Sequence, residues 1–249
     1  MKQKLLTSKL IISLVALLTV AACNVFPGAS KAADMSLETI QPVSTAETLV
    51  QDANFRDDLT KDFSKNWGLK ILSGVEKQLI TSQEGGKFRV RLMTGNDSNF
   101  VFINKGTNFK DVVVKAEVRY LESSTAYTAV VCRASDKGWY EFRINSKGSY
   151  QVLKYDQYLK DVGKNAYVDL VGEERRSPLI KTGKEINSMA LSCNGNQLIA
   201  YINNEQVFLD SRPLAITDDG YSEGTIGFGV SGNGGSADLS ISYIETLKP

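Results

Sequence analysis

Residues 108–156 contain two runs in which apolar and polar positions alternate: NFKDVVVKAEVRY (108–120) and YTAVVCRASDKGWYEFRINSKGSYQVLKYD (127–156). Successive side chains of a β-strand point to opposite sides, so a period of two predicts strands rather than helices. The second run is interrupted by SDKG (135–138) and NSKG (145–148), whose Asp, Asn and Gly residues suit tight hairpin turns. The segment is therefore predicted to form an antiparallel meander.

The rest of the chain past residue 52 repeats this pattern in short segments with turn signals between them and no helical periodicity. Further strands are predicted at 79–81, 87–93, 100–104, 187–193, 196–203, 206–209, 225–230 and 237–246. Asn194-Gly195 is predicted to be a two-residue hairpin turn, and 156–184 a long irregular loop. This pattern predicts an all-β fold, a two-sheet antiparallel β-sandwich in one domain spanning residues 52–249.

The chain begins with the basic segment MKQK, followed by the apolar run LIISLVALLTV (10–20), which is too short for a typical membrane-spanning helix. The next residues, VAAC (20–23), resemble the lipobox of bacterial lipoproteins. That resemblance implies cleavage after residue 22 and acylation of Cys23; the alternative is an ordinary signal peptide. Residues 23–51 are predicted to be a lipidated N-terminus and flexible linker.

Acylation of Cys23 would make membrane lipid a partner of this protein and fix it to the membrane surface. The expected location is the bacterial cell envelope, outward from the cytoplasmic membrane. Asn24, in place of Asp, favours the outer membrane where the host has one. The formal net charge is +1 and no basic run is present, so no nucleic-acid partner is expected.

Cys132 and Cys193 lie in predicted strands on sides that also carry apolar residues. Both are predicted to face the core, where an exported protein can keep a disulfide; two unrelated buried thiols are the alternative. The chain has no histidine, which excludes Ser-His-Asp and Cys-His catalysis and the usual zinc sites. No metal or other cofactor is expected. A Ca²⁺ ion at Asp218 and Asp219 is a weaker alternative to a solvated turn.

A polar group is expected on the side of the meander that faces away from the core. It consists of Arg133, Glu141 and Arg143, which suit the binding of sugar hydroxyls or a carboxylate. Tyr201 joins this group if Leu198, Ala200 and Ile202 face inward. The other interpretation is a solvated ladder of cross-strand salt bridges. Trp139 is either an exposed platform for stacking on a sugar or a packing residue at a strand edge.

Four segments give the domain a resemblance to the concanavalin A-like lectin/glucanase (laminin G-like) superfamily. They are DFSKNW (62–67), VVCRASDKGWYEFRI (130–144) with the adjoining GSYQVLKY (148–155), NSMALSCNGNQLIAYINNEQVF (187–208) and GTIGFGV (224–230). More narrowly, the domain is similar to 3-keto-disaccharide hydrolase-type domains of exported bacterial proteins. The resemblance implies a concanavalin A-like jelly roll.

The resemblance leaves three functions open. The first is a non-catalytic carbohydrate-binding domain that uses Arg133, Trp139, Glu141, Arg143 and Tyr201. The second is a hydrolase or lyase acting on 3-keto-glycosides with Glu141 as its catalytic carboxylate. The third is a structural or protein-binding component of the envelope. Strand signatures of the type Glu-x-Asp-x-x-Glu, which mark β-glucan hydrolases of this superfamily, are absent from the sequence.

Overall fold

The structure is a computed structural model and describes residues 53–93, 97–232 and 234–249. The predicted signal peptide (1–22), the linker (23–51) and Cys23 lie outside these residues. The described residues belong to one compact unit with bounds at Val43 and Pro249, and this unit carries all the described strands and the core that they enclose. We therefore expect this segment to fold on its own.

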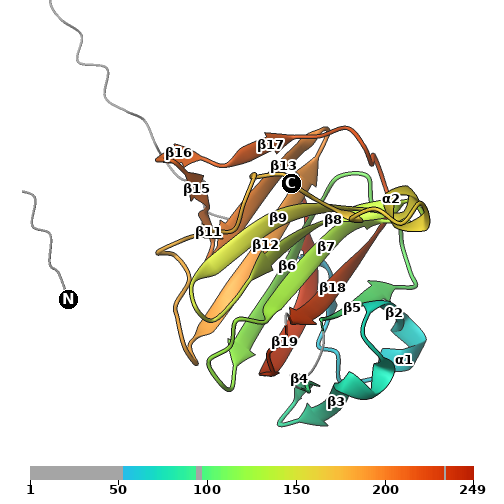
Figure 1. The fold of residues 1–249 in the computed structure, drawn as a ribbon, viewed down its shortest axis with the longest axis vertical. Coiled ribbons are helices and arrows are strands. Elements are labelled where there is room, and N and C mark those ends of the chain that lie inside the picture. The colour runs from blue at the N-terminus through green and yellow to red at the C-terminus, as the bar shows by residue number, and fades with distance from the viewer. Residues whose placement is uncertain (1–52, 94–96, 233) are drawn as a thin grey trace, which may run out of the picture. The chain divides into compact units, whose positions relative to one another are not determined.

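Two large antiparallel sheets make up the domain, as predicted (Figure 1). Sheet A follows the order β14 (Glu205–Gln206), β13 (Gln197–Ile202), β12 (Ile186–Asn194), β6 (Val112–Tyr120), β19 (Ala237–Leu247), β4 (Lys87–Leu92) and β3 (Leu79–Glu84). In addition, β1 (Ala53–Asp57) pairs with β19, and β17 (Ala215–Thr217) pairs with β13.

Sheet B follows the order β10 (Tyr167–Asp169), β9 (Ser149–Asp156), β8 (Gly138–Ile144), β7 (Tyr127–Ala134), β18 (Thr225–Gly232), β5 (Ser98–Asn104) and β2 (Trp67–Ser73). The short strand β11 (Arg175–Arg176) also pairs with β9. A separate ribbon joins β15 (Phe208–Leu209) to β16 (Arg212–Pro213). The helices are α1 (Phe63–Asn66) and α2 (Gln157–Asp161), with one 3₁₀ turn at Glu76–Gln78.

The core lies between the two sheets and follows the predicted alternation. Along β8, the side chains of Tyr140, Phe142 and Ile144 are fully buried in it. Cys132 on β7 and Cys193 on β12 form a disulfide that joins sheet B to sheet A across this core. The predicted pairing of the two cysteines is therefore confirmed.

Most predicted strands are confirmed with shifts of up to three residues at their ends, but the predicted strand 206–209 is divided between β14 and β15. Two connections also differ from expectation. The hairpin between β12 and β13 closes at Asn194↔Gln197, so its two loop residues are Gly195 and Asn196, with Gly195 at φ 56°. The irregular segment 156–184 contains α2 and two short strands, which extend sheet B at its β9 edge. Among the described residues, no helix is long and apolar enough to cross a membrane.

Candidate functional site

The outer face of sheet B, turned away from the core, carries the alternate residues of β8. Glu141 and Arg143 both point to this face, and their side chains form an ion pair along the strand. Only 1 % of Glu141 and 9 % of Arg143 is exposed. The pair is therefore buried on a sheet face that is normally solvated, and it is not the exposed cross-strand ladder that the sequence allowed.

Aromatic rings bury this ion pair. Trp139 stacks on Tyr155 of the neighbouring strand β9, with ring centroids 4.0 Å apart and planes inclined by 16°. The indole Nε1–H donates to Glu141 Oε2 at 2.9 Å, and the Arg143 guanidinium lies 4.5 Å above the ring of Tyr167. We call these five residues, Trp139, Glu141, Arg143, Tyr155 and Tyr167, the outer cluster.

Several contacts cross the outer face between strands that are far apart in the sheet order. Asn99 on β5 donates to Tyr167 Oη on β10 at 2.9 Å, although four strands lie between them. The ammonium group of Lys70 on β2 lies 5.0 Å from the Trp139 ring, and Lys160 Nζ donates to the Leu72 carbonyl at 3.3 Å. Neighbouring strands are about 4.8 Å apart, so sheet B must curl strongly around the outer cluster to allow these contacts.

Burial and the charges of the outer cluster shift the pKa values of Arg143, Tyr167 and the neighbouring Lys70. Burial alone would lower the pKa of Arg143, but the Glu141 carboxylate and Tyr167 outweigh it, and the net pKa is raised. Burial, and then the charge of Glu141, raises the pKa of the Tyr167 hydroxyl far above its ordinary value. Burial together with Lys160 lowers the pKa of Lys70. The cluster therefore keeps a permanent cation and a protonated phenol around one carboxylate.

A cavity of about 310 Å³ lies beside the outer cluster on the same face; we call it the polar pocket. Most of the residues that line it carry a hydroxyl, amide or charged group: Ser73, Asp97, Ser98, Asn99, Thr125, Tyr127, Arg143, Gln151, Glu174, Ser231 and Gly232. Arg143 and Asn99 join it to the outer cluster. Hydroxyl, amide and carboxylate groups that converge in one cavity are suited to hydrogen-bonding a polar ligand.

Of two residues that line the polar pocket, Tyr127 has a hydrogen-bond partner in the protein and the side chain of Gln151 has none among the described residues. The Tyr127 hydroxyl donates to Glu174 Oε2, and burial followed by this carboxylate raises the pKa of Tyr127. Gln151 lies opposite Arg143 in the register of β8 and β9 and is partly buried. The structure records no hydrogen bond for its carboxamide to any described residue. Gln151 is thus a free donor and acceptor in the pocket wall.

The structure confirms the predicted placement of Glu141 and Arg143, and of the two alternatives for Trp139 it supports the packing residue. Glu141 and Arg143 lie together on the outer face, as expected, and Trp139 lies next to them. Only 1 % of Trp139 is exposed, however, so its ring is not an open platform. Lys70 and Tyr155 occupy the space around the ring that a sugar would need.

Arg133 does not belong to this surface, in contrast to the prediction. A β-bulge interrupts the pairing of β7 with β18, and Arg133 has φ 53° there, which breaks the alternation of side chains. Its guanidinium is buried and donates to the carbonyls of Lys110 (3.0 Å) and Tyr221 (2.9 Å), and reaches Asp111 at 3.4 Å. Arg133 therefore holds two connecting segments against the end of β7.

Tyr201 is also misplaced by the prediction, because its strand belongs to the other sheet. It does lie on an outer face, with Leu198 and Ala200 in the core, but the face is that of sheet A. There it packs with Val113, Ala190 and Leu247. The core of the sandwich separates Tyr201 from Glu141 and Arg143.

Of the two acidic residues considered for Ca²⁺, Asp218 is engaged in hydrogen bonds within the protein. Asp218 Oδ1 accepts hydrogen bonds from Tyr140 and from Lys154 Nζ (2.9 Å), and from the Gly220 amide (2.8 Å). Burial alone would raise the pKa of Asp218, but these hydrogen bonds lower it overall. In the part of the chain that the structure describes, no group of three or more acidic, Cys or His residues is placed to hold a metal ion.

The sequence analysis missed Asn99, Gln151, Tyr155 and Tyr167. Tyr155 and Gln151 had a detectable signal, because both fall on the outward positions of the 149–156 run in register with Trp139 and Arg143. Tyr167 and Asn99 had none. Tyr167 stands in a segment without regular alternation, and only the curl of sheet B brings it to Asn99.

No protein-family model matches the chain, and no curated protein matches it either. Solved structures do match. The carbohydrate-binding module CBM66 from Bacillus subtilis covers 73 % of this chain, with 96 % of its own length, at 14 % identity and a TM-score of 0.51. A family 16 endo-glucanase from Bacteroides ovatus covers 78 %, with 99 % of its own length, at 12 % identity and a TM-score of 0.54.

A third match is a Bacillus subtilis protein of unknown function with a galectin-like fold, at 12 % identity and a TM-score of 0.51. The match covers 80 % of this chain and 99 % of the Bacillus subtilis protein. At such low identities these likenesses concern the fold, which binding modules and hydrolases share. With its two curled antiparallel sheets, the described part of this protein has a two-sheet β-sandwich fold like that of these matched structures.

Proposed function

We propose that this protein is a lipid-anchored, extracytoplasmic carbohydrate-binding protein without catalytic activity. The observation that carries the proposal is the polar pocket on the outer face of sheet B. Its hydroxyl, amide and carboxylate groups match the donors and acceptors of a sugar, and the buried Glu141–Arg143 pair holds one wall in a fixed position. The likeness to a carbohydrate-binding module supports the proposal through the fold alone.

The ligand is expected to contact residues at the rim of the outer cluster rather than Trp139 itself. Gln151 offers a free carboxamide, Tyr127 a protonated hydroxyl and Arg143 a guanidinium whose charge Glu141 balances. A pocket of about 310 Å³ is at the small end of ligand sites, which suits one or two sugar residues. The proposed specificity is therefore for a short or terminal sugar unit.

Binding is tested with the Val43–Pro249 segment on a glycan array, followed by calorimetry on any glycan that binds. Gln151→Ala should weaken binding about fivefold or more, because it removes one hydrogen-bonding group from the pocket. Gln197→Ala, at an exposed position of sheet A, is the matched control and should bind normally. The proposal would be overturned if no glycan bound, or if both variants lost affinity equally. Recovery of an envelope protein instead would favour the structural role.

Hydrolysis is the second candidate, because Asp97 and Glu174 both line the pocket, and glycoside hydrolases use two carboxylates. Glu141 is a poor candidate for this role, since it is buried and already accepts hydrogen bonds from Trp139 and Arg143. Release of product from 4-nitrophenyl glycosides or 3-keto-glycosides that is lost in Asp97→Asn and Glu174→Gln would favour this candidate.

The proposed anchor rests on VAAC (20–23) and is tested separately. Mass spectrometry of the mature protein should find an acylated Cys23 as its first residue. Cys23→Ser should remain unprocessed or appear in the soluble fraction instead of the membrane fraction. An unmodified N-terminus at another residue would instead indicate an ordinary signal peptide.

A further inference from the structure

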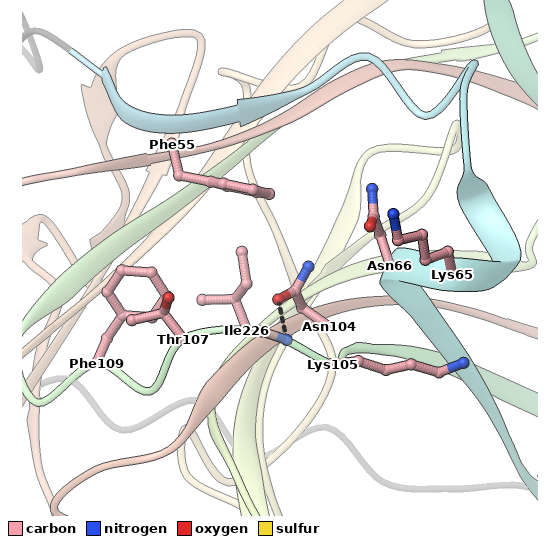
Figure 2. A pocket seen from close by; sticks show the side chains of 9 residues that line it. Phe55, Lys65, Asn66, Asn104, Lys105, Thr107, Phe109 and Ile226 are labelled. Atoms are coloured by element: carbon pink, nitrogen blue, oxygen red, sulfur yellow. Dashed lines mark hydrogen bonds between the residues drawn. The ribbon is translucent and has the colours of Figure 1, made fainter.

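A second cavity has a volume of about 490 Å³ and is shown from close by in Figure 2. Strand β1, helix α1, the segment after β5 and the start of β18 enclose it; we call it the end cavity. The residues that line it are Phe55, Lys65, Asn66, Asn104, Lys105, Gly106, Thr107, Phe109 and Ile226. It shares no residue with the polar pocket.

One side of the end cavity is cationic. Lys65 and Lys105 come from different segments and lie on the same side of the cavity as Asn66 in Figure 2. Lys105 Nζ donates to the Ser64 carbonyl at 2.8 Å, whereas the structure records no partner for Lys65 Nζ among the described residues. No acidic residue is among those that line the cavity. The lining therefore carries two positive charges that no lining carboxylate balances.

A buried amide adds an independent sign of a ligand. Only 8 % of Asn104 is exposed, and its Oδ1 accepts a hydrogen bond from the Gly106 amide at 2.8 Å. The structure records no acceptor for its Nδ2 group among the described residues. Figure 2 shows this nitrogen on the side of Asn104 that faces Asn66. This nitrogen is not among the described side-chain atoms that are buried without a partner, so it is open to the cavity and can donate to an acceptor bound there.

The opposite side of the end cavity is apolar. Phe55, Phe109 and Ile226 form it, and both phenylalanines are only partly buried. Figure 2 shows these three side chains grouped apart from the lysines. An occupant thus meets aromatic and aliphatic surface at one end and donors at the other.

We propose that the end cavity binds a small carboxylate-bearing molecule with an apolar body. The carboxylate would accept hydrogen bonds from Lys65, Lys105 and the Asn104 amide, and the apolar body would pack on Phe55 and Phe109. An acidic sugar, whose ring has an apolar C–H face, and a free aryl-alkyl acid share this chemistry. This site does not depend on the polar pocket, so either proposal can be disproved without affecting the other.

The probes are two matched pairs, titrated into the Val43–Pro249 segment and followed by calorimetry and NMR shifts. Galacturonate is compared with galactose, and 3-phenylpropionate with 3-phenylpropanol, so that each pair differs in its acidic group. Binding of one or both acids, with no binding of their neutral counterparts, is the expected result. The acid that binds more tightly identifies the source of the ligand.

Substitutions of lining residues test whether the acid binds in the end cavity. Lys65→Gln should weaken it about fivefold, and Lys65→Gln with Lys105→Gln should remove it. Lys61→Gln, on an exposed lysine outside the cavity, is the control and should bind normally. Gly106→Ala leaves the charge unchanged, but its Cβ would lie 2.8 Å from Asn104 Oδ1 and so displaces the amide; it should also weaken binding.

Two results would overturn the proposal. One is the absence of saturable binding of either acid up to 10 mM, on the order of the weakest specific ligand affinities. The other is binding that survives the double lysine variant, or that Lys61→Gln weakens equally. Because Lys65 and Lys61 are both exposed, loss of folding would not explain a difference between their variants.

Discussion

The indole of Trp139 donates its Nε1–H to Glu141 Oε2 at 2.9 Å, from a position two residues earlier on the same strand. Both side chains are 1 % exposed, on the face of sheet B that points away from the sandwich core. This face is partly filled by the protein's own side chains.

Replacement of Trp139 by Phe should therefore cost stability. The ring would still stack on Tyr155, but Glu141 would lose a donor inside a buried cluster, at a cost of about 1–3 kcal/mol. Urea unfolding of the Val43–Pro249 segment measures this free energy. Tyr158→Phe, at an exposed position on α2, is the control and should change it by less than about 0.5 kcal/mol. An unchanged midpoint for Trp139→Phe would contradict the observed hydrogen bond.

The Glu141–Arg143 pair should be strongly coupled. Glu141→Leu alone leaves a buried guanidinium without its carboxylate and should cost about 3–5 kcal/mol. The double variant Glu141→Leu with Arg143→Met removes both charges and should be more stable than the single one. A double-mutant cycle in urea gives the coupling energy. Additive losses in that cycle would show that the two charges do not stabilise each other.

Reduction of the Cys132–Cys193 disulfide should lower the free energy of unfolding. The bridge spans 61 residues and joins the two sheets, so chain entropy gives on the order of 4 kcal/mol as an upper value. The urea midpoint with and without dithiothreitol measures the effect, and the Cys132→Ala/Cys193→Ala variant is the control that should not respond to the reductant. Equal midpoints for the oxidised and reduced wild type would contradict this prediction.

Stability should fall steeply at alkaline pH because several tyrosines are buried. Burial raises the pKa of Tyr120, Tyr140 and Tyr167 well above 10.0, and that of Tyr221 to about 12. Above pH 10 the unfolded chain releases these protons while the folded one keeps them, so unfolding becomes more favourable as pH rises. The contribution is complete below pH 10 and is lost above it.

Tyr167→Phe separates this effect from other alkaline titrations. The variant should lose less stability than the wild type between pH 10 and 11, by about 1 kcal/mol, since the unfolded wild type releases most of one additional proton in this range. Urea midpoints at several pH values measure the slope. Tyr158→Phe is again the control. Identical slopes for the wild type and Tyr167→Phe would contradict the assigned burial of the phenol.

Local alternation determines much of this protein. The period of two in 127–156 is enough to predict β7, β8 and β9, and it correctly puts Tyr140, Phe142 and Ile144 inside. The disulfide was also predictable, because both cysteines share sides with apolar residues. These features depend on which side of a strand a residue occupies, which neighbouring residues in the sequence already fix.

Which residues form the candidate site depended instead on how strands that are distant in the sequence pair and on how sheet B curves. Strand β13 belongs to sheet A, which removes Tyr201 from the outer face of sheet B; no local pattern says which sheet a strand joins. The bulge in β7 turns Arg133 away because Cys132 and Arg133 together oppose one residue of β18. The curl of sheet B brings Lys70 and Tyr167 over the outer face and buries Trp139. The sequence by itself thus determined the strands, their inward faces and the disulfide, whereas pairing between distant strands and the curvature of the sheet decided which side chains meet on its surface.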